Sequence, residues 1–279
     1  MMHLGLVGFP LEHSLSPFIH QAALGSCGIE GTYSLFPVHP DDKQGLKALL
    51  VRVRSGEITG LNVTIPHKQA LVPLMDELTN TARAIGAINT ISMKKGKLTG
   101  ENTDANGFLR DLERAIRVKG HRRTALVLGA GGAARAVVCA LLNDGWRVSV
   151  AARRPEQALA LTAQFPGRDS RLSSLPYHPA ALRQQLPALT LLVNTTPVGM
   201  SPHVEASPWP AGLPFPGNGA VYDLVYDPGE TRLVRDARAA GLPAVTGLGM
   251  LVEQAALAFE FWTGCIVERE SLYAAMEEL

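Results

Sequence analysis

The sequence predicts an α/β protein of two lobes, an N-terminal α/β lobe and a Rossmann-type, doubly wound nucleotide-binding lobe. Short β-branched runs alternate with helical patterns almost throughout, which is typical of βαβ units and a mostly parallel sheet. A glycine-rich turn of the G-x-G-x-x-A type, at residues 129–134, stands between a strand-like and a helix-like run. At 279 residues the chain is long enough for two modest domains.

The first series of elements ends near Asp104. Strands are expected over residues 4–8, 32–38 and 61–65, with helices opening at Pro17 and spanning 41–53. Residues 87–92 and 97–100 predict a hairpin, and residues 105–117 a helix. A second series predicts strands over 124–128, 146–151, 189–193 and 220–225, and helices over 132–143, 155–164, 231–240 and 250–262. Residues 201–219, rich in Pro and Gly, are expected to be loop.

Composition excludes several classes of protein. Hydrophobic residues make up 46% and charged residues 18% of the chain, which is ordinary for a globular protein with a full core. A net charge of +1 provides no basic field for nucleic acid, and no apolar run approaches a membrane span. Cys27, Cys139 and Cys265 lie far apart among apolar neighbours, so we expect reduced, buried thiols. A soluble, cytoplasmic protein with small-molecule ligands is expected.

The turn at residues 129–134 predicts a dinucleotide site. Gly129 allows a tight turn, Gly131 lets the backbone approach a pyrophosphate, and Ala134 permits close packing of helix on strand. The pyrophosphate would lie on the helix N-terminus, where free N–H groups favour anions. The alternative is a small-residue turn of any doubly wound sheet.

The end of the next strand bears on the choice of cofactor. NAD-binding folds usually carry an acidic residue here for the ribose 2′-hydroxyl, but this chain has Arg153 and Arg154. Guanidinium groups suit a phosphate, so the pair favours NADP(H). Two arginines that solvate a strand end are the alternative.

Ser14 and Ser16 precede a predicted helix and form a candidate carboxylate site. Two residues apart in extended chain, their hydroxyls would point the same way, toward a helix N-terminus that favours anions. Alternatively Ser16 only caps the helix, although that role leaves Ser14 unexplained.

Three further segments end predicted strands with polar groups. On the strand before Pro66, Asn62 and Thr64 share one face while Val63 and Ile65 face the core, and Lys68 follows at the ligand-binding end of the sheet. Asn89 and Asp104 end the next two strands, although Asp104 taken singly reads as a helix N-cap.

An ammonium beside a carboxylate supplies the proton that ketone reduction requires, so Lys68 with Asp104 is the candidate catalytic pair. Gln254, at the edge of the apolar stripe of the last helix, needs a polar partner, for which a substrate hydroxyl is one candidate. The histidines lack paired ligand spacing, so no metal site is expected.

Eight motifs in this order resemble those of the shikimate dehydrogenase family, and they span essentially the whole chain. They are Ser14-x-Ser16-Pro17, Asn62-Val-Thr64-x-Pro-x-Lys68, Gly86-Ala-Ile-Asn89-Thr90, Asn102-Thr103-Asp104, Gly129-Ala130-Gly131-Gly132-Ala133, Asn194-Thr195-Thr-Pro-Val-Gly-Met200, Asp223-Leu-Val-Tyr226-x-Pro and Gly247-x-x-Met-Leu-x-x-Gln254.

The resemblance implies reversible, NADPH-dependent reduction of 3-dehydroshikimate to shikimate in aromatic amino-acid biosynthesis. It implies a substrate-binding and catalytic domain of residues 1–104 plus 248–279 and an NADP-binding domain of residues 105–247. Ser14 and Ser16 would hold the carboxylate, and Lys68 and Asp104 would form the catalytic pair. The ring hydroxyls would be bound by Asn62, Thr64, Asn89, Asp104 and Gln254, with Tyr226 lining the site. The cofactor would be bound by Gly129, Ala130, Gly131, Gly132, Ala133, Arg153, Arg154, Asn194, Thr195 and Met200, and Gly247 would contact the nicotinamide.

The family commonly has Asn-Arg-Thr where this chain has Ala152-Arg153-Arg154, so the sequence leaves the strictness for NADP open. The rivals are an NAD-dependent quinate/shikimate dehydrogenase, a non-catalytic homologue that binds ligand and nucleotide, and a methylene-tetrahydrofolate dehydrogenase. The absence of an acid beside Arg153 counts against the first, and the presence of both Lys68 and Asp104 against the second. A methylene-tetrahydrofolate dehydrogenase would not require the paired serines. Activity on quinate and the choice between monomer and homodimer stay open.

Overall fold

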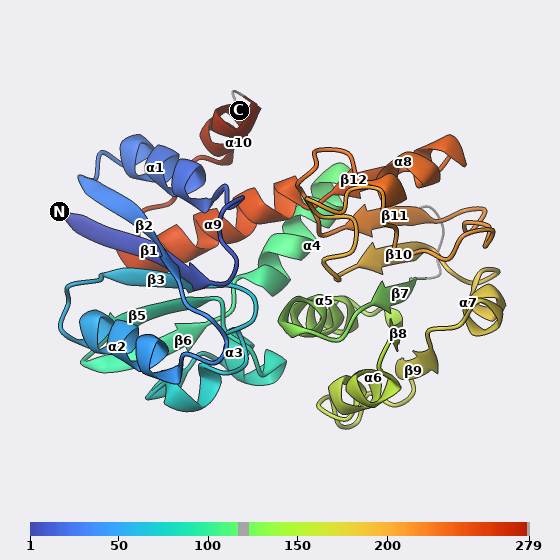
Figure 1. Cartoon of the computed structure of the whole chain (residues 1–279), viewed down its shortest axis with the longest axis horizontal. Coiled ribbons are helices and arrows are strands. Elements are labelled where there is room, and N and C mark those ends of the chain that lie inside the picture. The colour runs from blue at the N-terminus through green and yellow to red at the C-terminus, as the bar shows by residue number, and fades with distance from the viewer. Residues whose placement is uncertain (117–122, 278–279) are drawn as a thin grey trace. The chain divides into compact units, whose positions relative to one another are not determined.

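The computed structural model describes residues 1–116 and 123–277. The chain divides into two compact units, the first comprising Met1–Gly107 with Leu251–Leu279 and the second Phe108–Met250. Each unit contains its own six-stranded sheet with helices packed on it (Figure 1). The α/β fold class predicted from the sequence is confirmed, whereas the assignment of substrate and cofactor to the two predicted domains stays a prediction.

The sheet of the first unit is mixed, and its strand order is β2-β1-β3-β5-β6-β4. Its strands are β1 (Met2–Gly8), β2 (Gly31–Pro37), β3 (Gly60–Val63), β4 (Glu77–Leu78), β5 (Thr90–Lys94) and β6 (Lys97–Glu101). Strand β5 runs antiparallel to both neighbours, with Thr90 paired to Asn62 of β3 and to Glu101 of β6. The amino end of β5 therefore lies beside the carboxyl ends of β3 and β6.

Helices cover this sheet and bury its apolar residues. They are α1 (Ser16–Ser26), α2 (Lys43–Arg54), α3 (Asn80–Ile85), the start of α4 (Asp104–Ala115), most of α9 (Leu248–Thr263) and α10 (Arg269–Glu277), with a short 3₁₀ turn, η1 (Val72–Leu74). Leu46, Leu50 and Val53 of α2 pack with Leu61 and Ile91 of the sheet in one core cluster. Helix α4 ends at Ala115, and Arg117, its predicted last residue, lies outside the described residues.

The second unit has a parallel sheet of order β12-β11-β10-β7-β8-β9. The strands are β7 (Thr124–Leu128), β8 (Arg147–Ala152), β9 (Leu172–Pro176), β10 (Leu191–Asn194), β11 (Ala220–Asp223) and β12 (Ala244–Thr246). The connecting helices are α5 (Gly132–Asn143), α6 (Pro155–Thr162), α7 (Pro179–Gln185) and α8 (Arg232–Ala239). Successive strands are added on one side of β7 up to β9 and on its other side from β10 onward, so the carboxyl ends of β7 and β10 form the switch point of a Rossmann sheet, where ligands bind.

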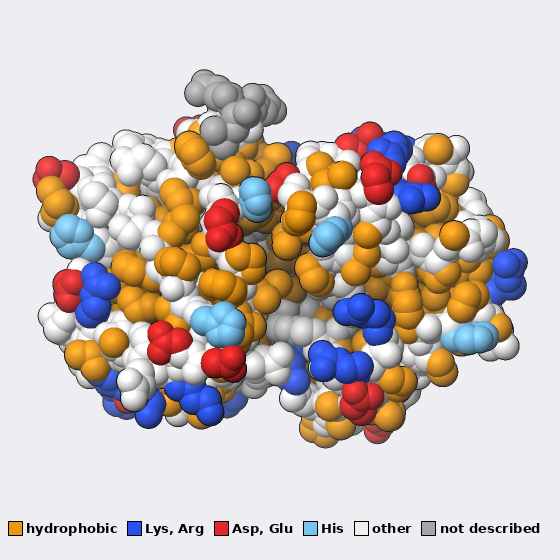
Figure 2. Space-filling model, in the orientation of Figure 1, with side chains coloured by type: hydrophobic (Ala, Val, Ile, Leu, Met, Phe, Trp, Pro, Cys, Tyr) orange, Lys and Arg blue, Asp and Glu red, His pale blue; other side chains and the backbone are white. Residues whose placement is uncertain are grey.

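The surface combines both charge signs with apolar groups. On the face shown in Figure 2, acidic and basic side chains are interspersed with hydrophobic ones. Among residues 1–116 and 123–277, no helix is long and apolar enough to cross a membrane. The same described residues contain no group of three or more His, Cys, Asp or Glu arranged to hold a metal ion.

The prediction of three buried thiols is wrong for two of them. Cys27 and Cys265 are partly exposed and form a disulfide across 238 residues of sequence, whereas Cys139 is a buried free thiol. Cys27 follows the last residue of α1, and Cys265 lies between α9 and α10. The packing of α10 on α1 brings the two sulfurs together. The residues next to each cysteine in the sequence do not reveal this long-range contact.

A buried carboxylate connects the ends of β10 and β11 in the second unit. Asp223, fully buried at the end of β11, accepts hydrogen bonds from Asn194 Nδ2 at 2.8 Å, Thr231 Oγ1 at 2.7 Å and the Val225 N–H at 3.1 Å. Burial raises the pKa of Asp223 from 3.8 to about 6, although these donors favour the charged form. The protonated form is therefore favoured in the folded state relative to the unfolded chain.

We expect loss of the disulfide to lower the free energy of unfolding by about 2–4 kcal/mol, because the bond constrains the unfolded chain. Denaturant unfolding of Cys27→Ser, Cys265→Ser and the double variant measures this. The free energy of unfolding should fall by the same amount in each single variant as in the double variant. The reduced wild-type protein should have the same free energy of unfolding as the variants. Equal stability of wild type with and without reductant would contradict the expectation.

Asp223 should make stability depend on pH. Between about pH 4 and about pH 6 the unfolded chain loses this proton while the folded protein keeps it, so this contribution to stability falls as pH rises. Relative to Asp223→Asn, wild type should lose on the order of 3 kcal/mol across that window. Unfolding of both proteins across this pH range measures the difference. Asp41→Asn, at a side chain that is 92% exposed, is the control, and a flat difference for Asp223→Asn would refute the assignment.

Candidate active site

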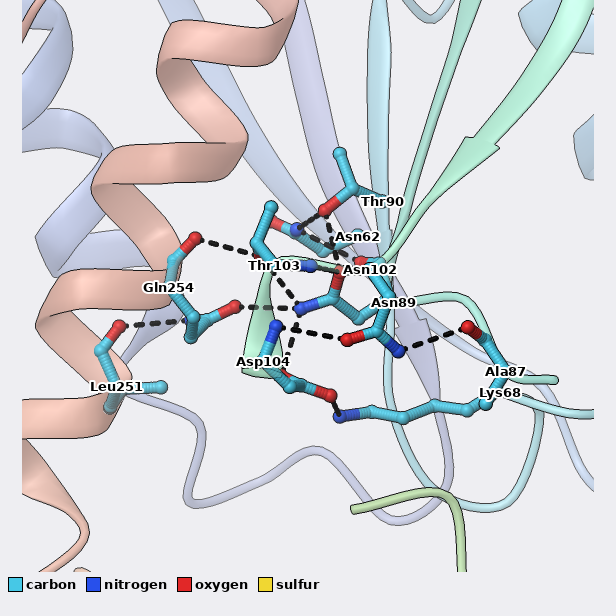
Figure 3. Close-up of polar contacts among 10 residues, drawn as sticks. All are labelled: Asn62, Lys68, Ala87, Asn89, Thr90, Asn102, Thr103, Asp104, Leu251 and Gln254. Atoms are coloured by element: carbon cyan, nitrogen blue, oxygen red, sulfur yellow. Dashed lines mark hydrogen bonds and ion pairs between the residues drawn. The ribbon is translucent and has the colours of Figure 1, made fainter. Parts of the chain in front are cut away.

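The Lys and Asp paired by the sequence reasoning are in direct contact in the first unit. Lys68 Nζ donates to Asp104 Oδ2 at 2.6 Å, and the side chains are 14% and 4% exposed (Figure 3). Lys68 lies in the turn after β3, and Asp104 is the first residue of α4, three residues after Glu101, which ends β6. A buried ion pair is stable only where its remaining polar atoms also have partners.

Asn89 supplies those partners from the start of β5. Its Nδ2 lies 2.8 Å from Asp104 Oδ1, 2.8 Å from Thr103 Oγ1 and 3.2 Å from Gln254 Oε1. Its Oδ1 accepts from the Thr103 N–H at 2.8 Å and from the Thr90 hydroxyl at 2.9 Å. Two amide hydrogens thus face three acceptors, and Asn89 orients both Asp104 and Gln254 (Figure 3).

The position of Asn89 differs from the predicted one. Residues 87–92 were expected to form a strand that Asn89 and Thr90 end, but β5 begins at Thr90. The residue is nevertheless beside the ends of β3 and β6: its carbonyl accepts from the Val63 N–H at 2.8 Å, and its N–H donates to the Glu101 carbonyl at 3.0 Å. Antiparallel pairing of β5 produces this placement.

Asn102 and Thr103 hold the turn before α4, and the sequence reasoning gave neither a role. Asn102 Oδ1 accepts the Asp104 N–H at 3.1 Å, and Asn102 Nδ2 donates to the Ala87 carbonyl at 2.9 Å. Thr103 Oγ1 donates to the Gln254 carbonyl at 3.0 Å. The signal was available, because a polar Asn-Thr-Asp run directly before a helix predicts side-chain bonds to backbone.

Gln254 reaches this network because α4 and α9 approach closely. A Cβ on Gly107 of α4 would lie 2.8 Å from both the Cβ and the backbone nitrogen of Gln254, so only glycine fits there. Gln254 Nε2 donates to the Leu251 carbonyl at 2.9 Å. The side chain is thus fixed at both ends of its amide.

Asn62 is engaged inside the fold. Its Oδ1 accepts from the Tyr33 hydroxyl at 2.8 Å, and its Nδ2 lies 3.1 Å from the Asn89 carbonyl and 3.3 Å from Thr90 Oγ1. The Tyr33 ring stacks on His20, with 4.5 Å between ring centroids. Burial lowers the pKa of His20 to about 3, so this imidazole is neutral at physiological pH and supplies no proton. The sequence reasoning missed both rings.

The expected core position of Ile65 is wrong. Strand β3 ends at Val63, and Ile65, two residues beyond it, is 55% exposed, because the alternation of faces stops with the strand. Thr64, directly after β3, is half-buried.

The two serines are close, but the geometry expected for them is wrong. Leu15 between them is helical (φ −84°, ψ −3°), so the segment is not extended. Ser14 Oγ accepts the Ser16 N–H at 3.3 Å, and Ser16 is the first residue of α1, with no side-chain cap at this helix end. The Ser16 side chain therefore does not cap the helix.

In the second unit, the glycine-rich turn fits a dinucleotide phosphate. Gly129 has φ +112°, and a Cβ there would lie 2.5 Å from Thr195 Oγ1. Gly131 precedes α5, which has no side-chain N-cap, and a Cβ on Gly131 would meet nothing within 4 Å. The open space and the uncapped helix N–H groups suit an anion. Ala134 is fully buried, in keeping with close helix packing.

The other predicted site residues of the second unit lie in the segments that follow its strands. Thr195 donates through Oγ1 to the Leu128 carbonyl at 2.7 Å, and Met200 is 39% exposed. Asn194 is fully buried, with its amide bonded to Asp223 and to Thr196. Ala130, Gly132 and Ala133 are half-buried in the turn, Gly247 follows β12, and Tyr226 follows β11 half-buried.

Arg153 and Arg154 are exposed just beyond β8. Neither forms an ion pair with any part of the chain that the structure describes. Two exposed guanidinium groups without an ion-pair partner suit a phosphate better than a ribose hydroxyl.

Comparisons with known proteins identify relatives of the chain. A family model of the shikimate dehydrogenase substrate binding domain matches residues 6–91, and a model of the shikimate 5′-dehydrogenase C-terminal domain matches residues 247–277. The chain is 44% identical to the NADP⁺ shikimate dehydrogenase of Salinibacter ruber, over 97% of this chain and 95% of that protein.

Solved structures match over both units. Shikimate 5-dehydrogenase of Thermus thermophilus, in complex with NADP(H) and shikimate, has a TM-score of 0.87 and 42% identity, covering 100% of this chain and 99% of that one. Quinate dehydrogenase of Corynebacterium glutamicum, in complex with NAD, has a TM-score of 0.88 and 30% identity, covering 100% and 99%. With this identity over nearly its whole length, the chain belongs to the shikimate dehydrogenase family.

Proposed function

We propose that the protein is an NADP-dependent oxidoreductase that reversibly reduces 3-dehydroshikimate to shikimate in the shikimate pathway. The observation that carries the proposal is the buried contact between Lys68 and Asp104. Relatives named NADP⁺ shikimate dehydrogenases, at 44% and 41% identity, support the substrate and the cofactor.

Lys68 is proposed to move the proton. The reduced cofactor supplies a hydride to the carbonyl carbon, and the carbonyl oxygen must gain a proton in the same reaction. The Lys68 ammonium, held by Asp104 Oδ2, is a donor of fixed position, and Asp104 Oδ1 is in turn held by Asn89. In the oxidative direction the same pair accepts the proton from the substrate hydroxyl.

The substrate is proposed to bind in the first unit. Ser14 and Ser16 lie at the N-terminus of α1, where a carboxylate is favoured. Gln254 Oε1 is the most distant of the three acceptors around Asn89 Nδ2, so a substrate hydroxyl that donates to it would relieve that competition. Ring hydroxyls are assigned to Asn62, Thr64, Asn89, Asp104 and Gln254, and Tyr226 is assigned to the lining.

NADP(H) is proposed to bind in the second unit, at the residues assigned from the sequence. The uncapped N-terminus of α5 and the open side of Gly131 suit the pyrophosphate, and Arg153 and Arg154 suit the 2′-phosphate. Thr195, which bonds to the Leu128 carbonyl at the end of β7, and Met200 are assigned to the cofactor, and Gly247 is assigned to the nicotinamide. The side-chain amide of Asn194 is bonded to Asp223 and to Thr196. Asn194 is therefore proposed to contribute to the cofactor site by holding the loop that follows it.

The second candidate is an NAD-dependent quinate/shikimate dehydrogenase, which the likeness to quinate dehydrogenase of Corynebacterium glutamicum keeps open. Arg153 and Arg154, without an acidic neighbour, favour NADP. We further propose a cytoplasmic monomer or homodimer that binds neither nucleic acid nor membrane. The disulfide is unusual for a cytoplasmic protein, because thiols in the cytoplasm are usually reduced.

Replacing Lys68 by Ala should lower kcat by about 10²-fold or more while shikimate still binds, because the variant loses the proton donor and keeps the hydrogen-bonding groups. Steady-state rates and a direct binding titration measure the two effects. Lys47→Ala, at an exposed residue of α2, is the matched control. Near-normal turnover of the Lys68 variant would remove its assigned role.

The choice of cofactor and substrate can be measured from nicotinamide absorbance. We expect a higher kcat/KM with NADP⁺ than with NAD⁺, and with shikimate than with quinate. A preference for NAD⁺ and quinate would instead establish the second candidate. If the protein binds a nicotinamide cofactor and shikimate or quinate but oxidises neither substrate, it is a non-catalytic homologue.

A further inference from the structure

Helix α5 carries a buried arginine whose charge the chain does not neutralise. Arg135 is 7% exposed, and its Nε is buried without a hydrogen-bond partner. Within residues 1–116 and 123–277, its guanidinium forms no ion pair and no hydrogen bond. Burial lowers the pKa of Arg135, but arginine stays charged at any physiological pH. A buried, unpaired charge destabilises a fold, so its presence calls for an explanation.

A partly buried arginine of this chain shows how a structural guanidinium is accommodated. The side chain of Arg269 is 16% exposed, and it forms ion pairs with both Glu253 and Glu260 of α9. Two carboxylates thus compensate one guanidinium where the role is packing. Arg135 has no such partner. Its counter-charge would therefore have to be an anion from outside the chain.

The position of Arg135 indicates which anion. Its backbone N–H donates to the Gly131 carbonyl at 3.1 Å, which places it one turn into α5. Side chains of an α-helix lean toward its N-terminus, so we expect the Arg135 side chain to lie over the turn that begins at Gly131. That turn has no side-chain N-cap and is open at Gly131. The guanidinium and the free helix N–H groups therefore serve one anion site.

The same edge of the sheet holds the other arginines. Strands β7 and β8 are adjacent and parallel, with Leu128 paired to Ala151, and the Gly129 N–H donates to the Ala151 carbonyl at 2.8 Å. Arg153 and Arg154 follow directly beyond β8. Helix α5, which connects these two strands, begins over their carboxyl ends, so all three arginines belong to one region.

We propose that Arg135 is a further phosphate-binding residue, which ion-pairs with a phosphate group of the bound dinucleotide. This inference rests on the proposed NADP(H) site. Both the pyrophosphate and the 2′-phosphate have the required chemistry, and binding of fragments distinguishes them. In the free protein the guanidinium is uncompensated, and in the complex the phosphate neutralises it.

The test is calorimetric binding of NADP⁺, ADP and 2′,5′-ADP to wild type, Arg135→Met and Arg135→Lys, together with the melting temperature of each free protein. Removing a charge-assisted contact should raise the Kd of NADP⁺ about 10-fold or more in Arg135→Met. Weaker binding of ADP assigns the pyrophosphate, and weaker binding of 2′,5′-ADP alone assigns the 2′-phosphate. Arg135→Lys, which keeps the charge, should recover part of the affinity.

The melting temperature separates a binding role from a structural one. Free Arg135→Met should melt at or above the wild-type temperature, because an uncompensated buried charge has been removed. Arg147→Met, an exposed residue at the amino end of β8, is the matched control and should change neither quantity. Unchanged binding of all three ligands would overturn the proposal, as would a fall of both affinity and stability in both variants. If wild type binds these ligands without oxidising shikimate, only the proposed activity fails; if it binds none of them, both fail.

Discussion

The buried ion pair of Lys68 with Asp104 is the constraint on which the rest of the first unit depends. Two charges removed from water need further partners, and both oxygens of Asp104 have one, since Oδ2 accepts from Lys68 and Oδ1 from Asn89. The backbone of Asp104 is held as well, because its N–H donates to Asn102. The carboxylate is therefore fixed before any ligand arrives, and the position of the ammonium follows from it.

The mixed sheet explains how such distant residues meet. In a parallel sheet all carboxyl ends lie at one edge, and β5 is the exception, because it runs the other way between β3 and β6. Its first residues therefore reach the ligand-binding edge, and Asn89 connects Val63 of one neighbour to Glu101 of the other. The close approach of α9 at Gly107 then adds Gln254, so four separate segments meet around a single amide.

The sequence predicted the elements and contacts that local chemistry determines. The strand, turn and helix of residues 124–143 were predicted because glycine spacing and apolar runs carry that signal, and Lys68 and Asp104 were paired because both follow strands. Short elements such as β4, α3, β9 and α7 were missed, since two to seven residues show too little periodicity. The hairpin of β5 and β6 was predicted and is confirmed, whereas the pairing of β5 with β3 and the bond between Cys27 and Cys265 depend on tertiary contacts, which local patterns do not encode. The predicted geometry of Ser14 and Ser16 is wrong because Leu15 between them is helical. The side chains therefore do not alternate as they would in an extended segment.

Lys68 of the first unit has a counter-charge within the chain and Arg135 of the second unit has none among the residues described, a difference that fits the roles proposed for the two groups. Lys68 has its counter-charge within the chain, so its ammonium stays in place whether or not the site is filled, as a proton donor must between turnovers. Arg135 has no counter-charge within the described residues, so a ligand that supplies one gains the whole interaction on binding. A carboxylate beside Arg135 would compete with a phosphate for the guanidinium and weaken the complex. The absence of a partner at Arg135 is thus expected of a ligand site, and the presence of one at Lys68 is expected of a catalytic group.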